Sequence, residues 1–258
     1  MTEIKVVQDR NEVIQSLSRD RPIQVYGLAD LELPVWIAST WWRRGAAFVG
    51  RVPLPGPEGI VAICAISPRE PHETSLLLRD LRDELPDGGL VVGPRGSADI
   101  MSEVSEIERL GDHVKMTVDT EGFVPPPGEL RSEVLTGADL PALLDLYASD
   151  PGAAFFLPSM LDDGLFVGVK EAGHLLAAGG THVRSDEFNL AALGGVLTSP
   201  SARGQGLAAD VTALLSRILL GEGRLVALNT HAENHTARRL YRRLGYHKVH
   251  TYTEFVLR

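Results

Sequence analysis

One segment, residues 196–220 with the sequence VLTSPSARGQGLAADVTALLSRILL, constrains the fold more than any other part of the chain. From Leu207 onward its apolar side chains recur at i, i+4, i+7, i+8, i+11 and i+12, ending at Leu219. That spacing predicts a helix of about four turns with one buried face. The apolar run at residues 190–197 predicts a strand immediately before it. A strand that leads through a short connection into a buried helix is typical of a mixed α/β sheet.

The start of this helix has the composition of an anion site. Free backbone N–H groups at a helix N-terminus attract anions, and glycine lets a phosphate approach them closely. An arginine there adds charge-assisted hydrogen bonds. The pattern contains neither the Lys-Ser/Thr pair of NTPase phosphate loops nor a dinucleotide G-x-G-x-x-G. We therefore predict a different phosphate site at six residues: Arg203, Gly204, Gln205, Gly206, Leu207 and Ala208.

A second motif lies downstream, at residues 234–246 with the sequence NHTARRLYRRLGY. Asn234 and Tyr241 are seven positions apart, so on one continuous helix their side chains would lie about 20° from each other. An Asn at a helix start and a Tyr on a half-buried face are also ordinary structural choices. The motif gains its functional meaning from its position after the glycine-rich helix start.

Together the two motifs resemble those of the GNAT superfamily of acyl-CoA N-acyltransferases. Arg203, Gly206 and Ala208 match the superfamily's R-x-x-G-x-A pattern, with Pro200 three residues before the arginine. Residues 234–246 match its N-x-x-A-x-x-L-Y-x-x-x-G-[FY] pattern throughout. The resemblance implies acetyl-CoA as the co-substrate and an amine-bearing molecule as the acceptor.

The resemblance also implies a role for each site residue. The pyrophosphate would lie on the glycine-rich helix start. The pantetheine arm would pair with the exposed backbone of Val196, Leu197 and Thr198, and it would contact Asn234. A backbone N–H of that strand would polarise the thioester carbonyl, and Tyr241 would act as the acid that protonates the leaving thiolate.

The expected reaction is transfer of an acetyl or other short acyl group to a primary amine by direct attack in a ternary complex. The alternative is a regulatory or scaffold module that binds acyl-CoA without turnover. The strand at residues 190–198 carries no titratable side chain, so the general base stays open among His182, Glu187 and His231. The acceptor is equally open, because loops determine it rather than the fold.

A proline run, residues 124–128 with the sequence VPPPG, predicts a linker, since polyproline is extended and does not join a sheet interior. We expect a degenerate GNAT-like domain at residues 1–124, the linker at 125–129 and the catalytic domain at 130–258. Where the second domain has RGQG the first has PHET, and Glu73 at a helix start would repel a pyrophosphate. This arrangement is similar to that of glycine N-acyltransferases. It implies an α/β (α+β) fold of tandem GNAT-like domains, each a mixed, mainly antiparallel sheet flanked by helices.

The order strand, strand, helix, strand, helix, strand is expected in both domains. In the first, the later elements are predicted as a helix at 73–85, a strand at 90–92, a helix at 98–110 and a strand at 113–118. In the second, strands are predicted at 165–169, 175–183, 190–197, 225–228 and 250–257, with helices after residue 206 and at 233–244.

Composition argues against several classes of protein. A net charge of −9 is unlike that of a nucleic-acid-binding protein, which needs a basic face. Cys64 is the only cysteine, so no intrachain disulfide can form, and a cytoplasmic location is expected. No apolar run has transmembrane length, so no membrane association is expected. We expect no metal, because the histidines have no ligand-spaced partners, and we leave a homodimer open.

Overall fold

The computed structural model describes residues 3–54 and 59–258, which form two compact units. The boundary between the units differs from the expected linker at residues 125–129. The units exchange segments, because the end of the chain packs with the first unit. The proline run lies in an irregular stretch of the second unit, between residues 119 and 132. Unit 1 consists of Met1–Lys115, Thr230–Asn234 and Val249–Arg258, and unit 2 of Met116–Asn229 and His235–Lys248.

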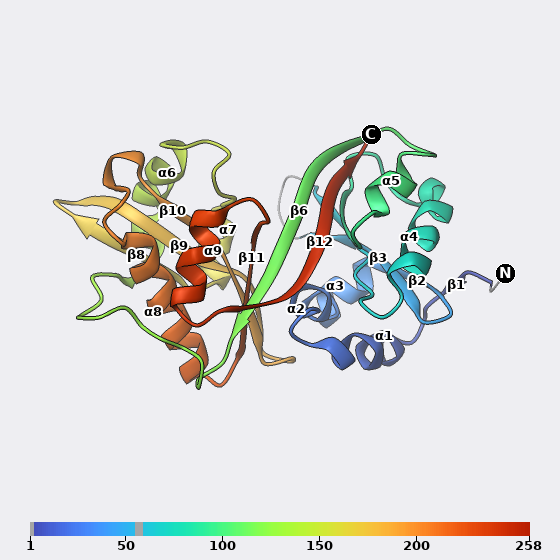
Figure 1. The fold of residues 1–258 in the computed structure, drawn as a ribbon, viewed down its shortest axis with the longest axis horizontal. Coiled ribbons are helices and arrows are strands. Elements are labelled where there is room, and N and C mark those ends of the chain that lie inside the picture. The colour runs from blue at the N-terminus through green and yellow to red at the C-terminus, as the bar shows by residue number, and fades with distance from the viewer. Residues whose placement is uncertain (1–2, 55–58) are drawn as a thin grey trace. The chain divides into compact units, whose positions relative to one another are not determined.

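Unit 1 is built on a mixed sheet with the strand order β1-β2-β3-β4-β5-β12-β6 (Figure 1). From β1 to β5 the neighbours pair antiparallel except β4 and β5, which run parallel because a helix connects them. The strands are β1 (Lys5–Val6), β2 (Thr40–Arg44), β3 (Ala47–Pro53), β4 (Val61–Cys64), β5 (Leu90–Gly93), β6 (Ile107–Val118) and β12 (His247–Leu257). The helices are α1 (Arg10–Leu17), α2 (Val25–Ala29), α3 (Leu33–Ala38), α4 (Pro71–Asp80) and α5 (Ser97–Met101).

The core of unit 1 lies between its sheet and the helices α4 and α5. Leu77 of α4 and Met101 of α5 are fully buried in one cluster with Ile63 of β4. Phe255 and Leu257 of β12 belong to the same cluster, and β12 pairs antiparallel with β5. Burial of such side chains contributes roughly 1.5–3 kcal/mol each. The last strand therefore completes unit 1, although it follows unit 2 in sequence.

Unit 2 repeats this plan with the strand order β11-β10-β9-β8-β7. Its neighbours pair antiparallel except β10 and β11, which run parallel and are connected by the longest helix, α8. The strands are β7 (Glu133–Val134), β8 (Phe166–Glu171), β9 (His174–Ser185), β10 (Leu190–Thr198) and β11 (Leu225–His231). The helices are α6 (Leu140–Ala148), α7 (Ser159–Asp163), α8 (Leu207–Gly221) and α9 (His235–Arg243).

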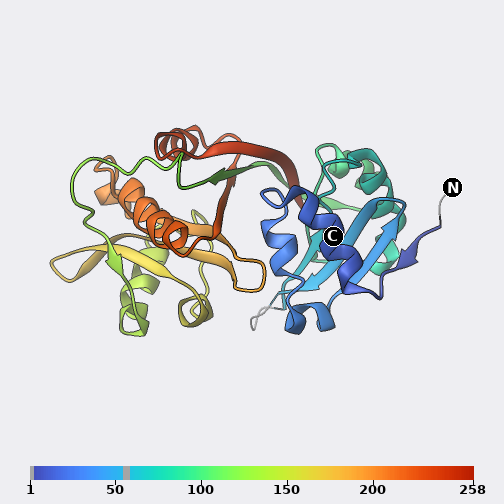
Figure 2. The same ribbon diagram turned by 90° about the horizontal axis from the view of Figure 1, so that it is seen from below.

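Helices cover both faces of the sheet in unit 2. Figure 2 shows α8 on one face of the strands and α6 on the other. Successive residues of β9 face these two layers: Gly179 lies against Val211 of α8, and Gly180 lies against the ring of Phe166. Phe166 packs in turn with Leu143 of α6. The glycine-rich helix start therefore lies at one end of a helix that is anchored along its length.

The expected fold class is confirmed, with a mixed, mainly antiparallel sheet and flanking helices in each unit. The helix expected at residues 98–110 is wrong. α5 ends at Met101, where the Ser102 hydroxyl donates to the Asp99 carbonyl, and β6 begins at Ile107. Among the described residues no helix combines the length and apolar character needed to cross a membrane.

Candidate functional site

Two parallel strands of unit 2 separate toward their carboxyl ends. β10 and β11 pair only from Leu190 opposite Leu225 to Leu193 opposite Leu228. β10 then continues through residues 194–198 with β9 on one side, and β11 continues into Asn229. In the described structure the other edge of β10 has no strand neighbour there. We call these separated strand ends, residues 194–198 and Asn229, the fork.

The fork contains two buried polar atoms, Thr198 Oγ1 and Asn229 Oδ1, that have no hydrogen-bond partner among the described residues. A buried polar atom left unpaired costs about 1–3 kcal/mol, so a ligand that displaced the covering groups and bonded to these atoms would recover that cost. Val196, Leu197 and Thr198, which were predicted to line the coenzyme, form one arm of the fork. Asn229 lies outside both sequence motifs, although it is the first polar side chain in the apolar strand β11.

The glycine-rich helix start presents unpaired backbone amides. Gly204 and Gly206 have φ angles of +81° and +79°, which side chains rarely tolerate. A Cβ at either position would meet open space, so the backbone conformation is what requires glycine. Within the described residues, no backbone N–H from Arg203 to Ala208 donates a hydrogen bond, and α8 extends for 15 residues from Leu207. Free amides and the positive end of a helix dipole favour an anion, so we call this helix start the candidate anion site.

Two arginines lie beside these amides. The guanidinium of Arg203 forms an ion pair with Asp150, so an entering phosphate would share or replace that partner. Arg131, which belongs to neither sequence motif, donates from Nη2 to the Gln205 carbonyl over 3.0 Å. Asp210, in the first turn of α8, accepts the backbone N–H of Arg131 at 2.9 Å and holds that segment against the helix. Arg131 also lies 3.7 Å from the Asp210 carboxylate, so both arginines beside the amides have a carboxylate partner that an entering phosphate would share or replace.

Tyr241, the predicted acid, is 8% exposed on α9. Burial raises its pKa to about 12, so the phenol is neutral and keeps its proton at physiological pH. In the described structure its hydroxyl has no hydrogen-bond partner. Tyr246, whose ring centroid is 6.0 Å away, has its hydroxyl 2.7 Å from the Ser216 hydroxyl on α8. One tyrosine is thus bound into the fold and the other is left available.

Asn234 precedes α9 instead of lying on it, since the helix begins at His235. The relation of about 20° between Asn234 and Tyr241, which assumes one continuous helix, does not apply. The backbone N–H of Asn234 donates to the His231 carbonyl over 2.9 Å in a tight turn between β11 and α9. Its predicted contact with the pantetheine arm stays a prediction.

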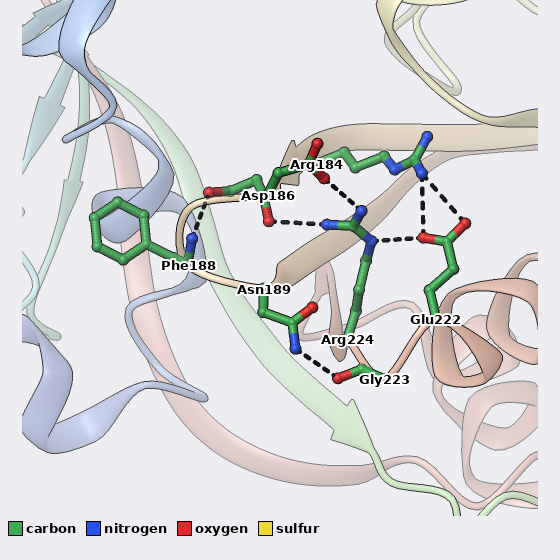
Figure 3. Close-up of polar contacts among 8 residues, drawn as sticks. Arg184, Asp186, Phe188, Asn189, Glu222, Gly223 and Arg224 are labelled. Atoms are coloured by element: carbon green, nitrogen blue, oxygen red, sulfur yellow. Dashed lines mark hydrogen bonds and ion pairs between the residues drawn. The ribbon is translucent and has the colours of Figure 1, made fainter.

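The structure separates the three candidates for the general base. Glu187 lies in the turn between β9 and β10, at the paired end of β10 and away from the fork. Figure 3 shows an ion pair between Arg224 and Asp186 of this turn, and Arg224 also pairs with Glu222 at the end of α8. His231 accepts the Glu233 N–H at Nδ1 over 3.2 Å, which occupies its basic nitrogen. His182 alone of the three touches the fork, because its ring lies against Gly194.

Among the described residues, no group of three or more His, Cys, Asp or Glu side chains is arranged to hold a metal ion.

Comparison with known proteins finds one family model that matches part of the chain and several solved structures with a similar fold. Residues 168–256 match a family model described as FR47-like protein. No curated protein matches the chain in sequence. A crystal structure of a putative GNAT-family acetyltransferase from Novosphingobium aromaticivorans is 24% identical, with a TM-score of 0.58 over 81% of this chain and 88% of that one.

Two further structures match along nearly the whole chain. A Drosophila protein is 16% identical, with a TM-score of 0.69 over 100% of this chain and 99% of that one. A tandem GNAT protein from the clavulanic acid biosynthesis pathway is 13% identical, with a TM-score of 0.57 over 99% and 98%. At these identities the likeness concerns the fold. The chain has the GNAT fold in its two-domain, tandem form.

Proposed function

We propose that this protein is an N-acyltransferase whose unit 2 binds acetyl-CoA and transfers the acetyl group to a primary amine. The GNAT fold supports acyl transfer at a general level, and several structures that share it are described as acetyltransferases. The finer assignment rests on the geometry of unit 2. Its substrate sites are the fork, the amides at residues 203–208 and the phenol of Tyr241.

The observation that carries the proposal is that two unpaired features occur together in one unit. The fork offers a strand edge and two buried polar atoms without partners. The helix start offers consecutive free amides beside Arg203 and Arg131. Coenzyme A has matching chemistry, since its pantetheine arm carries two amides and its pyrophosphate is an anion. The residues present therefore fit acetyl-CoA as a substrate.

The chain's own groups can support a direct transfer. A backbone N–H of the fork would polarise the thioester carbonyl and stabilise the oxyanion that forms when the amine attacks. The phenol of Tyr241, still protonated because its pKa is about 12, would donate its proton to the departing thiolate. No covalent acyl-enzyme is required in this scheme. Asn234 would contact the pantetheine arm, as in the family motif.

A thiol-release assay tests the proposal. The full chain is incubated with acetyl-CoA and a panel of primary amines and amino acids, and free coenzyme thiol is measured. Amine-dependent release would support the proposed function and begin to identify the acceptor. Binding of acetyl-CoA without release from any amine would contradict turnover and favour a regulatory acyl-CoA-binding module. Absence of binding would contradict the role of the fork and of the helix start.

A further inference from the structure

The fork has a histidine at the point where its strands separate. A Cβ added to Gly194, the first residue of β10 beyond the last pair with β11, would lie 2.2 Å from His182 Nδ1. The imidazole therefore packs directly on the backbone of that residue. It comes from β9, the strand on the other side of β10.

The hydrogen bond of His182 identifies its basic nitrogen. Nε2 lies 3.3 Å from the backbone carbonyl of Phe155, and a carbonyl oxygen can only accept, so Nε2 carries the proton. In the neutral ring Nδ1 is then the nitrogen with a free lone pair. Cγ and Cε1 lie 2.3 Å from the same Cβ position, nearly as close as Nδ1, so the face of the ring rests on Gly194. The proton acceptor of the ring therefore lies beside the fork, with its lone pair in the ring plane.

The surroundings of His182 keep the ring neutral. Burial lowers its pKa below the ordinary value, and the bond to Phe155 opposes this only in part. Of the elements packed against it, β10 contributes Gly194 and Gly195, and the loop after α6 contributes Phe155, whose ring centroid is 6.0 Å away. Tyr147 of α6 donates to the Gly195 carbonyl over 2.6 Å, and burial raises its pKa, so it stays neutral.

These contacts explain the glycine pair in the middle of β10. A Cβ on Gly195, whose φ is +61°, would lie 2.9 Å from the Tyr147 hydroxyl and 3.1 Å from the Phe155 carbonyl. The register between β9 and β10 shifts between Gly194 and Leu197. Because neither glycine has a Cβ, the side chains of His182 and Tyr147 can contact the backbone of β10 here. Any larger residue at these two positions would clash with them.

We infer that His182 is the general base of the proposed reaction, taking a proton from the acceptor ammonium at Nδ1. The inference rests on the proposed function and names a group that the sequence left open. The ammonium loses one proton to His182 and the free amine attacks the thioester carbonyl. A second proton leaves the nitrogen as the amide forms. In the overall balance it replaces the proton that Tyr241 gives to the thiolate. His182 returns its proton to solvent, so each turnover releases one proton.

The test is the pH dependence of kcat/KM for the full chain and its His182→Gln variant, with acetyl-CoA and the amine that the acceptor panel identifies. Glutamine keeps an N–H donor for the Phe155 carbonyl but is not a base. We expect kcat/KM near pH 7 to fall about 100-fold, with acetyl-CoA affinity within about twofold of the original. The variant's rate should then rise about tenfold per pH unit as the amine loses its own proton, so that the loss shrinks at high pH. His174→Gln, on the same strand and exposed, is the matched control and should change nothing.

A purely structural role would lower kcat/KM by the same factor at every pH. That result, or retention of kcat/KM within about threefold at pH 7, would overturn the inference while leaving the proposed function intact. If the original chain releases no thiol with any amine, the proposed function itself fails, and the inference fails with it.

Discussion

Each unit contains one equivalent pair of adjacent parallel strands, β4 and β5 in unit 1 and β10 and β11 in unit 2. Only the strands of unit 2 separate at their carboxyl ends. In unit 2 the pairing of β10 and β11 stops at Leu193 and Leu228, and the ends separate. In unit 1 the pairing of β4 and β5 continues to the end of β4, with Cys64 opposite Val92. The Ala65 N–H then extends it by donating to the Val92 carbonyl over 2.9 Å. A shared fold therefore does not imply a shared binding site, because hydrogen bonds beyond the strands decide whether an edge is free.

In unit 1, side chains of the unit itself form hydrogen bonds beyond the end of β4 and at the start of the next helix. The side chain of Gln24, 6% exposed, donates to the Ile66 carbonyl over 2.6 Å, just beyond the end of β4. The helix that follows begins with Pro71, which has no N–H, and carries Glu73 in its first turn. Glu73 is bound by the buried guanidinium of Arg44 at 2.5 Å. An anion would meet the Glu73 carboxylate at this helix start, which also has no glycine, so we propose that unit 1 is a non-catalytic partner.

Behind β4, unit 1 holds a group of charged and polar side chains instead of a ligand. The Cys64 thiol donates to the Asp30 carboxylate over 3.2 Å. Lys115, 1% exposed, donates to a backbone carbonyl and lies 4.9 Å from the ring centre of Tyr26 and 5.7 Å from that of Tyr252. Burial lowers the pKa of Lys115 to about 8 and raises that of Asp30 to about 6. In unit 1 this region of the fold thus holds a buried polar group, whereas in unit 2 we propose that the strand ends bind a substrate.

The largest expected effect comes from closing the anion site with Gly206→Glu. A carboxylate beside the free amides of unit 2 would reproduce the condition of unit 1 and exclude the pyrophosphate. We expect acetyl-CoA binding to weaken more than 100-fold, or about 3 kcal/mol, measured by titration calorimetry. Gly223→Glu is the matched control, since Gly223 has a similar φ of +76° in open space beyond the other end of α8. Equal losses in both variants would show that strain, and not the anion site, explains the effect.

The next effect sharpens the difference between two tyrosines of unit 2. Tyr241→Phe should lower kcat about 100-fold, or about 2.7 kcal/mol, with little change in acetyl-CoA affinity, since it removes only the proton donor. Tyr246→Phe removes the hydroxyl that bonds to Ser216 and should cost about 1 kcal/mol of stability with a small effect on kcat. Steady-state thiol release and urea unfolding measure the two quantities. An unchanged kcat in Tyr241→Phe would remove it as the acid.

The smallest expected effect concerns the buried carboxyl group of Asp30 in unit 1 and the pH dependence of that unit's stability. The folded pKa of Asp30 is about 6, above its ordinary value of 3.8, so the folded protein holds this proton more tightly than the unfolded chain does. The resulting contribution to stability is complete below about pH 4 and is lost as pH rises through 6. Relative to Asp30→Asn, the original chain should lose about 2 kcal/mol of stability between pH 4 and pH 7. Trp36, Trp41 and Trp42, the three tryptophans, all lie in unit 1, so tryptophan fluorescence during urea unfolding reports this unit. Parallel pH curves for the two proteins would contradict the buried carboxylate.

Much of this contrast could be predicted from local sequence, and some of it could not. The positive φ angles of Gly204 and Gly206 restrict those positions to glycine, so the helix start leaves a mark in the sequence. The fork leaves none, because it depends on which backbone groups find partners. The packing of β12 with unit 1 is equally hidden, since it depends on contacts between residues more than 150 positions apart, such as Phe255 and Val91. His182 was visible as a candidate, but only its contact with Gly194 distinguishes it from Glu187.

The number of acetyl-CoA molecules bound per chain tests the central claim most directly. Titration calorimetry with the full chain at several protein concentrations gives this stoichiometry without any assumption about the acceptor. Because the open fork and the glycine-rich helix start both lie in unit 2, the expected result is one molecule per chain, and none in Gly206→Glu. Two molecules per chain would show that unit 1 also binds. No binding, or one molecule that persists in Gly206→Glu, would show that the open strand pair of unit 2 is not the coenzyme site.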